Sequence, residues 1–452
     1  MKKILLCTYS LAFSISAYSA DLTEIFKQSE NHDPQLSAAQ YTLEATQEGK
    51  KQAFAAFLPQ VSSSYGRTFS KNKRNSSLAP GVNPSTTGEP EDWNVRLSQS
   101  LYDHANYENF KISELEILKS AADYDIAYQD FILRVAQSYF NVLSAKDSLV
   151  FAKAEEKAIQ RQLDQAEQRF EVGLAAITDV HEARATFDGA RARVIVANNT
   201  LEDANEALFE ISQRYYPEIA SAPDEIEFTN FTVQDMDAFQ ELGIRQNPEV
   251  ISSQIAKDIA EKRIAVNRSG HYPTLDLSFS RGQTFSPGSF ATQVDPQTGN
   301  PIQIGSGDII SNGTTASLNL SIPIYSGGRT SSQVRQAALQ HKAAMDRYEQ
   351  ARRSTVRNIR NAYHGFNASK SSIEARKLAM ISAQSGLEAT EAGYEVGTRT
   401  IVDVLNSQQR LYQAQGDYSR AKYDYFIQFL SLKQAAGSLN EQDINTINAI
   451  LK

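Results

Sequence analysis

Four short segments of the chain alternate between apolar and polar residues. The pattern is clearest in 317–324, where leucine or isoleucine occupies every second position, and it recurs in 61–69, 92–101 and 275–280. Period-two alternation gives a β-strand one apolar and one polar face. The sequence therefore predicts four strands per chain in two pairs, about 60–70 with 92–102 and about 274–284 with 314–325.

Segments 71–91 and 285–313, which join the paired strands, are rich in Gly, Pro, Ser, Asn and Thr. This composition is typical of surface loops. A helix is expected before each strand pair, about 22–57 and 235–271, because Pro59 and Pro273 disfavour further helix and favour extended chain.

Two very long helices are expected after the strands, at about 104–171 and 329–395. Neither range contains proline, and about 67 residues at the helical rise give about 100 Å. The motifs EVGLAAITDV (171–180) and EVGTRTIVDV (395–404) then reverse the chain into return helices, about 179–214 and 402–436.

Apolar residues at helical spacing predict side-by-side packing of these helices, as in coiled coils. In the first long helix they are Val135, Tyr139, Val142 and Leu149, then Ile159, Leu163, Ala166 and Phe170. An ordinary helix-bundle core would show the same pattern.

The order of elements repeats, which indicates a tandem duplication. Pro59 corresponds to Pro273, and Asp179 corresponds to Asp403. We expect a first repeat over 20–220, a second over 221–440 and a C-terminal tail over 441–452.

The first 19 residues read as a secretory signal peptide, with Lys2 and Lys3 before a short apolar run and small residues. The sole cysteine, Cys7, lies in that segment. The formal net charge of −8 disfavours nucleic-acid binding. The six histidines are scattered, and nucleotide-binding, metalloprotease and nucleophile-elbow motifs are missing. We expect no enzyme activity, no cofactor and no metal site.

Strand alternation alone fits a soluble sheet under helices as well as a membrane barrel. Four strands are too few to close a barrel, so a barrel would have to be shared between chains. Two, three or four chains would supply eight, twelve or sixteen strands, and the pattern does not choose among them.

Several motifs make the chain resemble the TolC-type outer-membrane efflux channels, also called the outer membrane factor family. The motifs are RQLDQ (161–165), RFEVGL (169–174), AITDV (176–180), LDL (275–277), IPIY (322–325) and AGYEVGTRTIVDV (392–404). The resemblance implies a mixed α/β membrane protein. A homotrimer would share one twelve-strand barrel in the outer membrane of a Gram-negative bacterium, continued by an α-helical coiled-coil tunnel across the periplasm.

The function implied is a passive exit duct for multidrug efflux and type I protein secretion. Its partners would be a periplasmic adaptor, an inner-membrane RND or ABC transporter and outer-membrane lipid. Its cargo would be drugs, bile salts or proteins.

The same resemblance implies a gate at the periplasmic tips, with links within and between chains. Within a chain, Asp179 would pair with Tyr394 and Thr178 with Arg399. Between chains, Arg399 would reach Asp179 of a neighbouring copy, and Gln162 would pair with Glu391. Charge-assisted bonds of about 1.5–3 kcal/mol each would bias closure yet remain breakable. Solvated helix charges are the alternative interpretation.

Two further features at the tips follow from the resemblance. Asp403 would form an acidic ring at the tunnel's narrowest point, with Asn406 where a second acid is expected, which implies weak cation selectivity. Gly173 and Gly397, which glycine chemistry at the end of an expected helix predicts to be turn residues, would also be adaptor-docking tips.

Two other functions fit parts of the pattern. A periplasmic structural protein made of coiled coils would explain the helices but not the strands. A surface receptor or adhesin would use the loops 71–91 and 285–313.

Overall fold

The computed structural model describes most of the chain as two compact units. The described residues are 20–73, 83–220, 235–288, 290–295, 297–305 and 307–451, so the predicted signal peptide lies outside them. The helical unit comprises the described residues of Met1–Thr42, Ala121–Ser253 and Tyr348–Lys452; the strand unit comprises those of Leu43–Ser120 and Gln254–Arg347. Each boundary between the units falls inside a helix.

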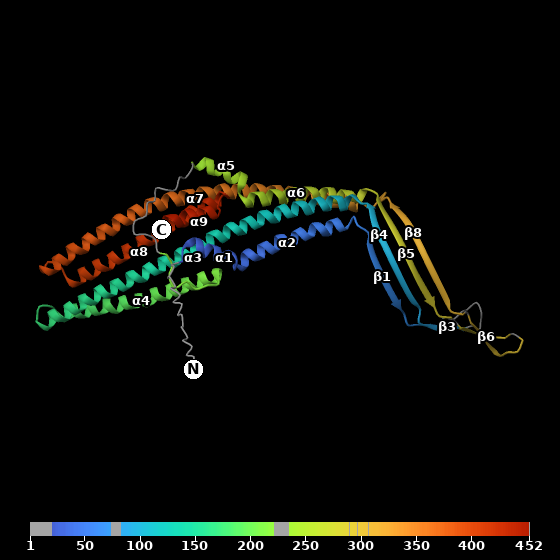
Figure 1. Ribbon diagram of the computed structural model, residues 1–452, viewed down its shortest axis with the longest axis horizontal. Helices are drawn as coiled ribbons and strands as arrows, with labels where there is room; N and C mark the ends of the chain where they lie inside the picture. Colours follow the sequence, from blue (N-terminus) through green and yellow to red (C-terminus); the bar gives the residue numbers. More distant parts are fainter. Residues whose placement is uncertain are drawn as a thin grey trace, which may run out of the picture. The chain divides into compact units, whose positions relative to one another are not determined.

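The strand unit contains a four-stranded antiparallel sheet (Figure 1). Its strands are β1 (Gln60–Arg67), β4 (Glu91–Tyr102), β5 (Thr274–Ser286) and β8 (Ile309–Ser321), in the order β1-β4-β5-β8. The pairs β1–β4 and β5–β8 are the two that the alternation predicts, and β4 pairs with β5 to join them. One sheet therefore combines strands from both halves of the sequence.

The strand register separates an apolar face from a polar face. Across the sheet, Val61, Leu97, Phe279 and Ala316 form one row of partners, and the same face holds Tyr65, Trp93, Val95, Leu277, Leu318 and Leu320. The opposite face is mostly serine, threonine and asparagine, and the hydroxyls of Ser278 and Ser317 lie 2.7 Å apart. Val61 is 68% exposed and Leu318 is 62% exposed, so the apolar face is open among the residues that the structure describes, unlike the covered face of a soluble sheet.

A second sheet occupies the segments predicted to be loops, so that prediction was wrong. Its strands are β2 (Ser70–Lys73), β3 (Asn83–Gly88), β6 (Phe290–Val294) and β7 (Pro301–Gly305), in the order β2-β3-β6-β7. The described residues thus hold eight strands in two sheets rather than four. The loop-like composition led to a wrong prediction because the hydrogen bonds between β-strands are made by backbone groups. Those groups can pair whatever polar side chains the strands carry.

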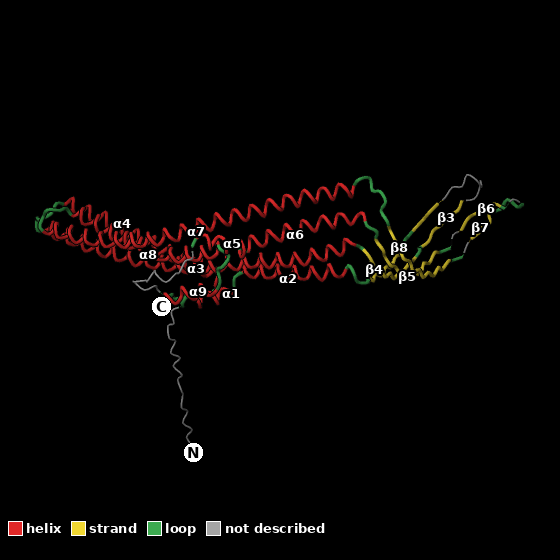
Figure 2. The backbone as a smooth tube through the Cα atoms, turned by 90° about the horizontal axis from the view of Figure 1, so that it is seen from above, coloured by secondary structure: helices red, strands yellow, loops and turns green. Residues whose placement is uncertain are grey.

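Two long helical hairpins run through the chain, drawn red in Figure 2. In one, α3 (His104–Glu171) leads to α4 (Ile177–Ser212); in the other, α7 (Arg329–Glu395) leads to α8 (Ile401–Ala435). These bounds lie within two residues of the predicted ranges. None of the described helices combines the length and apolar character needed to cross a membrane.

Aromatic side chains dominate the core of the helical unit. Phe140 of α3 stacks on Phe426 of α8 with ring centroids 5.4 Å apart, and Phe366 of α7 stacks on Tyr425 of α8 at 5.0 Å. The predicted stripe from Val135 to Ala166 is buried, whereas Phe170 at its end is 43% exposed.

The two helices predicted before the strand pairs are each divided. The first is α1 (Leu22–Glu30) followed by α2 (Pro34–Ala55); the second is α5 (Met236–Gln246), α6 (Pro248–Arg268) and the short 3-10 helix η2 (Ser269–His271). Proline begins α2 and α6 because a first helical residue needs no N–H group. The preceding residue caps each helix: a side-chain oxygen of Asp33 accepts from the Leu36 N–H at 2.7 Å, and that of Asn247 accepts from Glu249 N–H at 2.9 Å.

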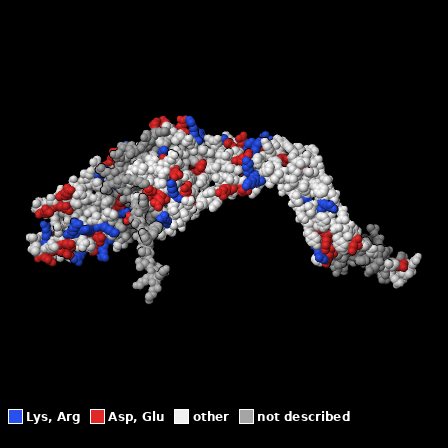
Figure 3. Space-filling model, viewed as in Figure 1, with Lys and Arg blue, Asp and Glu red and all other residues white. Residues whose placement is uncertain are grey.

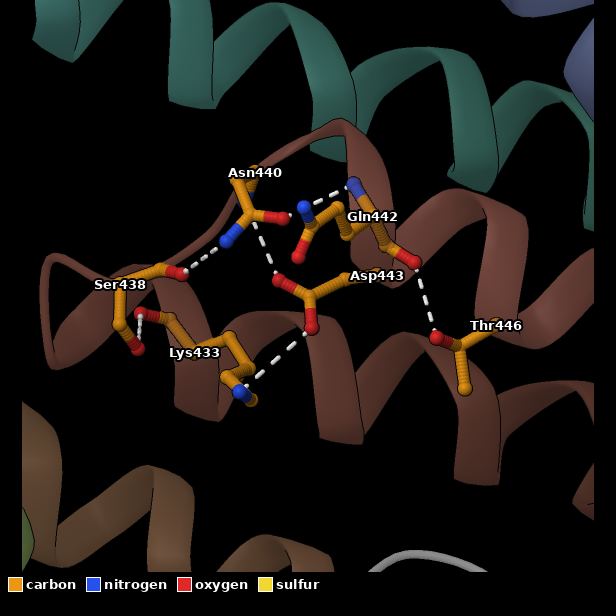
Figure 4. Close-up of polar contacts among 6 residues, drawn as sticks. All are labelled: Lys433, Ser438, Asn440, Gln442, Asp443 and Thr446. Carbon is orange, nitrogen blue, oxygen red and sulfur yellow. Dashed lines mark hydrogen bonds and ion pairs between the residues drawn. The ribbon is translucent and has the colours of Figure 1, made fainter.

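The range expected as a C-terminal tail contains a helix, α9 (Glu441–Leu451), which the sequence pattern did not predict. Asn440 and Asp443 organise its start: the Asn440 N–H donates to Asp443 at 3.1 Å, and Lys433 of α8 lies 3.5 Å from the same carboxylate (Figure 4). Ile444, Ile447 and Leu451 are buried, and α9 packs against α1. Eleven residues are few for an isolated helix, but α9 is stabilised because its apolar stripe packs into the core of the helical unit.

Gly437, in the turn between α8 and α9, should be intolerant of a side chain. Its φ is +69°, and a Cβ there would lie 2.4 Å from the Cα of Asn247. We expect Gly437→Ala to lower the free energy of unfolding by more than the ~1–2 kcal/mol of left-handed backbone alone. Loss of helical circular dichroism on heating measures this effect. Gly416→Ala in α8, where a Cβ has open space, is the control and should be neutral or stabilising; equal melting temperatures for the two variants would contradict the prediction.

Candidate functional site

The two hairpin tips end their first helices with the same backbone turn. Gly173 has φ +75° and Gly397 has φ +79°. In the first tip, Leu174 N–H donates to Arg169 C=O at 2.7 Å; in the second, Thr398 N–H donates to Gly393 C=O at 2.8 Å. This six-residue closure is a Schellman motif, which requires the left-handed residue that glycine supplies. The turn interpretation of both glycines is therefore confirmed.

The return helices begin differently. At α8, Thr400 and Asp403 form a capping box: the Thr400 N–H and hydroxyl each donate to Asp403 Oδ2 at 3.0 Å, and the Asp403 N–H donates to the Thr400 hydroxyl at 3.3 Å. At α4 the capping position is Ala176, which has no side-chain acceptor. Asp179, the counterpart of Asp403, consequently lacks this local partner.

The capping box also sets the charge state of Asp403. Hydrogen bonds from the Thr400 N–H and hydroxyl lower the pKa of Asp403, with the charges of Arg399 and Arg410 adding to the effect. The predicted ring residue is therefore an ionised carboxylate with one oxygen committed to the start of its own helix. Asn406, one turn further along α8, is exposed.

An apolar cluster joins the two tips to each other. Its buried members come from α3, α4 and α8, with Tyr394 of α7 packed against it: Ile159, Leu163, Ala166, Val180, Ala183, Ala190, Ile401 and Leu405. The two hairpins of one chain are thus held together near their ends by burial rather than by charge alone.

Arg169 of α3 and Tyr394 of α7 form a cation–π contact that links the two hairpins. The Arg169 guanidinium lies 4.7 Å from the centre of the Tyr394 ring, within cation–π range. Tyr394 is one of the residues expected at the gate, whereas Arg169 is not among them. The repeat offers a signal for Tyr394, because it stands where the first repeat has Phe170, but none identifies Arg169 as its partner.

The two links expected within one chain are not formed in the structure. Among the described residues, Asp179 and Tyr394 share no hydrogen bond, and neither do Thr178 and Arg399. The ring of Tyr394 instead faces Arg169, and the Asp179 N–H bonds to Ala176 C=O at 3.1 Å, inside its own helix start.

Gln162 and Glu391, the expected pair between chains, lie on α3 and α7. Glu391 receives the side-chain N–H of Gln408 at 3.4 Å, inside the α7–α8 hairpin. The side-chain oxygens of Gln162 and Gln408 are both buried without a hydrogen-bond partner among the described residues.

Ion pairs stiffen the first hairpin behind its tip. Arg193 of α4 donates to both carboxylate oxygens of Glu155 on α3, at 2.7 and 3.1 Å, and Glu155 is buried. Arg184 lies 2.6 Å from Glu167 closer to the tip. These bonds tie α4 to α3 within one hairpin, so α3 and α4 should move as one body.

The two tips should differ in how firmly their return helices start. We expect Thr400→Ala to speed hydrogen exchange at the start of α8 about fivefold, as for loss of an N-cap. Ala176→Thr should slow exchange at the start of α4, because it places threonine three residues before Asp179. Hydrogen-exchange mass spectrometry of the two tip peptides makes the measurement.

The same exchange measurement at low pH provides the control for the comparison of wild type with Thr400→Ala. Because the folded pKa of Asp403 is lowered, the box stabilises α8 at neutral pH and loses that stabilisation as the pH falls through the folded value. The difference between wild type and Thr400→Ala, each measured at the same pH, should therefore shrink in acid. A Thr400→Ala variant with unchanged exchange at neutral pH would show that the box contributes nothing.

Comparison with known proteins identifies the family to which this chain is similar. The chain matches the family described as outer membrane efflux protein over residues 25–212 and 242–438. It is 36% identical to the outer membrane protein TolC of Vibrio cholerae, over 100% of this chain and 99% of that protein. It is 26% identical to the alkaline protease secretion protein AprF of Pseudomonas aeruginosa, covering 96% and 88%.

Solved structures share the fold at low sequence identity. A crystal structure of CusC superposes with a TM-score of 0.74 at 17% identity, covering 93% of this chain and 92% of that one. The Campylobacter jejuni CmeC outer membrane channel gives 0.72 at 17% identity, covering 100% and 98%.

The relatives named above are outer-membrane, efflux or secretion proteins, and they lend no support to a structural coiled-coil protein or an adhesin. Both halves of the sequence match the same family, and the match extends over most of the chain. The chain belongs to the outer membrane efflux protein family and is an outer-membrane protein of a Gram-negative bacterium.

Proposed function

We propose that this chain is the outer-membrane exit duct of multidrug efflux and type I protein secretion systems, and that it is a passive channel gated at its helical tips. The observation that carries the proposal is the exposed apolar face of the β1-β4-β5-β8 sheet, in a chain that also carries two long hairpins with matching tips. An apolar face suits lipid, and long paired helices suit a conduit beyond the membrane.

Three copies would complete the channel. The outer edges of β1 and β8 leave backbone donors and acceptors free in one chain, and closure with other copies satisfies them. Three chains give a twelve-strand barrel, the number that the family resemblance implies. The polar face, with Ser278 and Ser317, then lines the lumen, and the apolar face contacts lipid.

The two repeats would have the same structural role in the channel. Each repeat, 20–220 and 221–440, contributes two strands of the sheet and one helical hairpin, and the two stretches that match the family fall one in each. In a trimer the tunnel would be built from six hairpins of two alternating kinds.

The gate lies at the tips. Thr178, Asp179 and Arg399 are free of local side-chain bonds in the described chain and so are available to a neighbouring copy. Between chains, the side-chain N–H of Gln162 would donate to the carboxylate of Glu391, because a carboxylate only accepts. Arg169 and Tyr394 add the link between hairpins of one chain.

Asp403 would place an acidic ring inside the closed tips. Its low pKa keeps it charged at neutral pH. With Asn406 in the next turn, one ring of three carboxylates replaces two, and we infer a weak preference for cations. Reversal potentials under a salt gradient, compared between wild type and Asn406→Asp, measure this preference.

The partners follow from the same arrangement. A periplasmic adaptor would dock on the tips around Gly173 and Gly397, whose left-handed turns present open backbone: a Cβ built on either glycine has no described neighbour within 4 Å. An inner-membrane RND or ABC transporter would supply the energy. The cargo would be drugs, bile salts or proteins.

Conductance in planar lipid bilayers tests the channel and its gate together. We expect wild type to conduct weakly and Arg169→Gln to conduct more, because loss of a cation–π contact of ~0.5–2 kcal/mol shifts the closed-to-open balance by about 2- to 30-fold per link. Tyr394→Phe keeps the ring and should stay close to wild type if the ring contact holds the tips.

The two variants separate competing gates. High conductance of Tyr394→Phe with normal Arg169→Gln would show that the Tyr394 hydroxyl, bonded to Asp179, is the restraint. Protein that inserts but never conducts, in any of these variants, would contradict the channel proposal itself.

A further inference from the structure

Arg281 lies on the apolar face of the sheet. In the register of β4, β5 and β8, Arg281 pairs with Val95 on one side and with Thr314 on the other. Phe279 precedes it by two residues and Gln283 follows by two, so all three point to the same face. Arg281 is exposed, and in the space-filling view the face of the strands that is seen carries few charges (Figure 3).

Arg281 has no acidic partner among the described residues. The side chains that flank it on its face are Val95, Phe279, Gln283 and Thr314, none of which is charged. Arg67, further along the same face, provides the contrast: it forms ion pairs with Glu89 and with Glu91. One of the two arginines on this face is therefore neutralised within the chain, and the other is not.

The position of Arg281 along the strand is close to a row of aromatic residues. The next row of the same face holds Tyr65, Trp93 and Gln283. Tyrosine and tryptophan on the outside of membrane sheets mark the level of the lipid headgroups. One row corresponds to two residues, or about 7 Å, which the flexible arginine side chain spans.

We infer that Arg281 binds the phosphate of an anionic lipid in the outer leaflet, an assignment that rests on the proposed function. An uncompensated guanidinium among uncharged neighbours, one row below the headgroup level, calls for an anion from outside the protein. Guanidinium and phosphate match in shape and can form two parallel hydrogen bonds. A shared barrel would carry one such site per chain.

The chain offers its own reporter for this site. Trp93 is the only tryptophan in the sequence, and it lies one row above Arg281 on the neighbouring strand and the same face. Brominated lipids quench tryptophan on contact. Full-length protein is reconstituted in phosphatidylcholine containing small amounts of either brominated phosphatidylglycerol or brominated phosphatidylcholine, and quenching of Trp93 gives the relative affinity for the anionic lipid.

We expect the wild type to prefer the anionic lipid about threefold to tenfold, and Arg281→Gln to show equal quenching by both lipids. Arg281→Lys should keep part of the preference, because a lysine binds phosphate without the two-point geometry. Arg96→Gln is the matched control: Arg96 is an exposed arginine of β4 on the polar face, and its removal should leave the preference unchanged.

The outcomes separate this site from the proposed channel. Equal quenching by both lipids in the wild type, or a preference that survives Arg281→Gln, would overturn the phosphate site while leaving the lipid-facing sheet intact. Loss of the preference when inorganic phosphate is added at millimolar concentration would assign the site to free phosphate instead. No quenching by either lipid would contradict the lipid-facing sheet, and hence the proposed function.

Discussion

Unpaired backbone groups at the edges of one sheet constrain what this chain can form. β1 and β8 each pair on one side only, and the face between them exposes apolar side chains such as Val61 and Leu318. In water such a sheet exposes apolar surface, and in lipid its edge N–H and C=O groups would lack partners. Pairing between copies of the chain would satisfy the edges, and the apolar face could then contact lipid, so the proposed gating and transport both depend on oligomerisation.

The tips combine modest contacts between the two hairpins with two different helix starts. Within one chain the hairpins are held by the cluster around Ile401 and by the contact of Arg169 with Tyr394, both of modest strength. The repeats share their Schellman turns but differ at the return helix, where Thr400 engages Asp403 and Ala176 leaves Asp179 uncommitted. Duplication thus produced one tip whose acid stabilises its own helix and another whose acid is available to a neighbour.

The sequence predicted elements that depend on local pattern and missed those that depend on tertiary partners. Alternation located β5 and β8, and the run without proline located α3, because each pattern extends over many residues. The second sheet and α9 were missed, since backbone pairing and a waiting core stabilise segments with weak local signals. At the tips, Gly173 and Gly397 were predictable from turn chemistry. The Arg169–Tyr394 contact joins residues 225 positions apart in the sequence, and spacing does not encode such a pair.

The most direct test is the mass of the assembled protein. Full-length chain, extracted from membranes in a mild detergent, is measured by native mass spectrometry after the detergent is removed in the gas phase. We expect a complex of three chains of 50.1 kDa each, less any signal peptide removed on export. A stable monomer that still conducts in bilayers would contradict it, because a single four-stranded sheet would then have met its edge requirement without other copies.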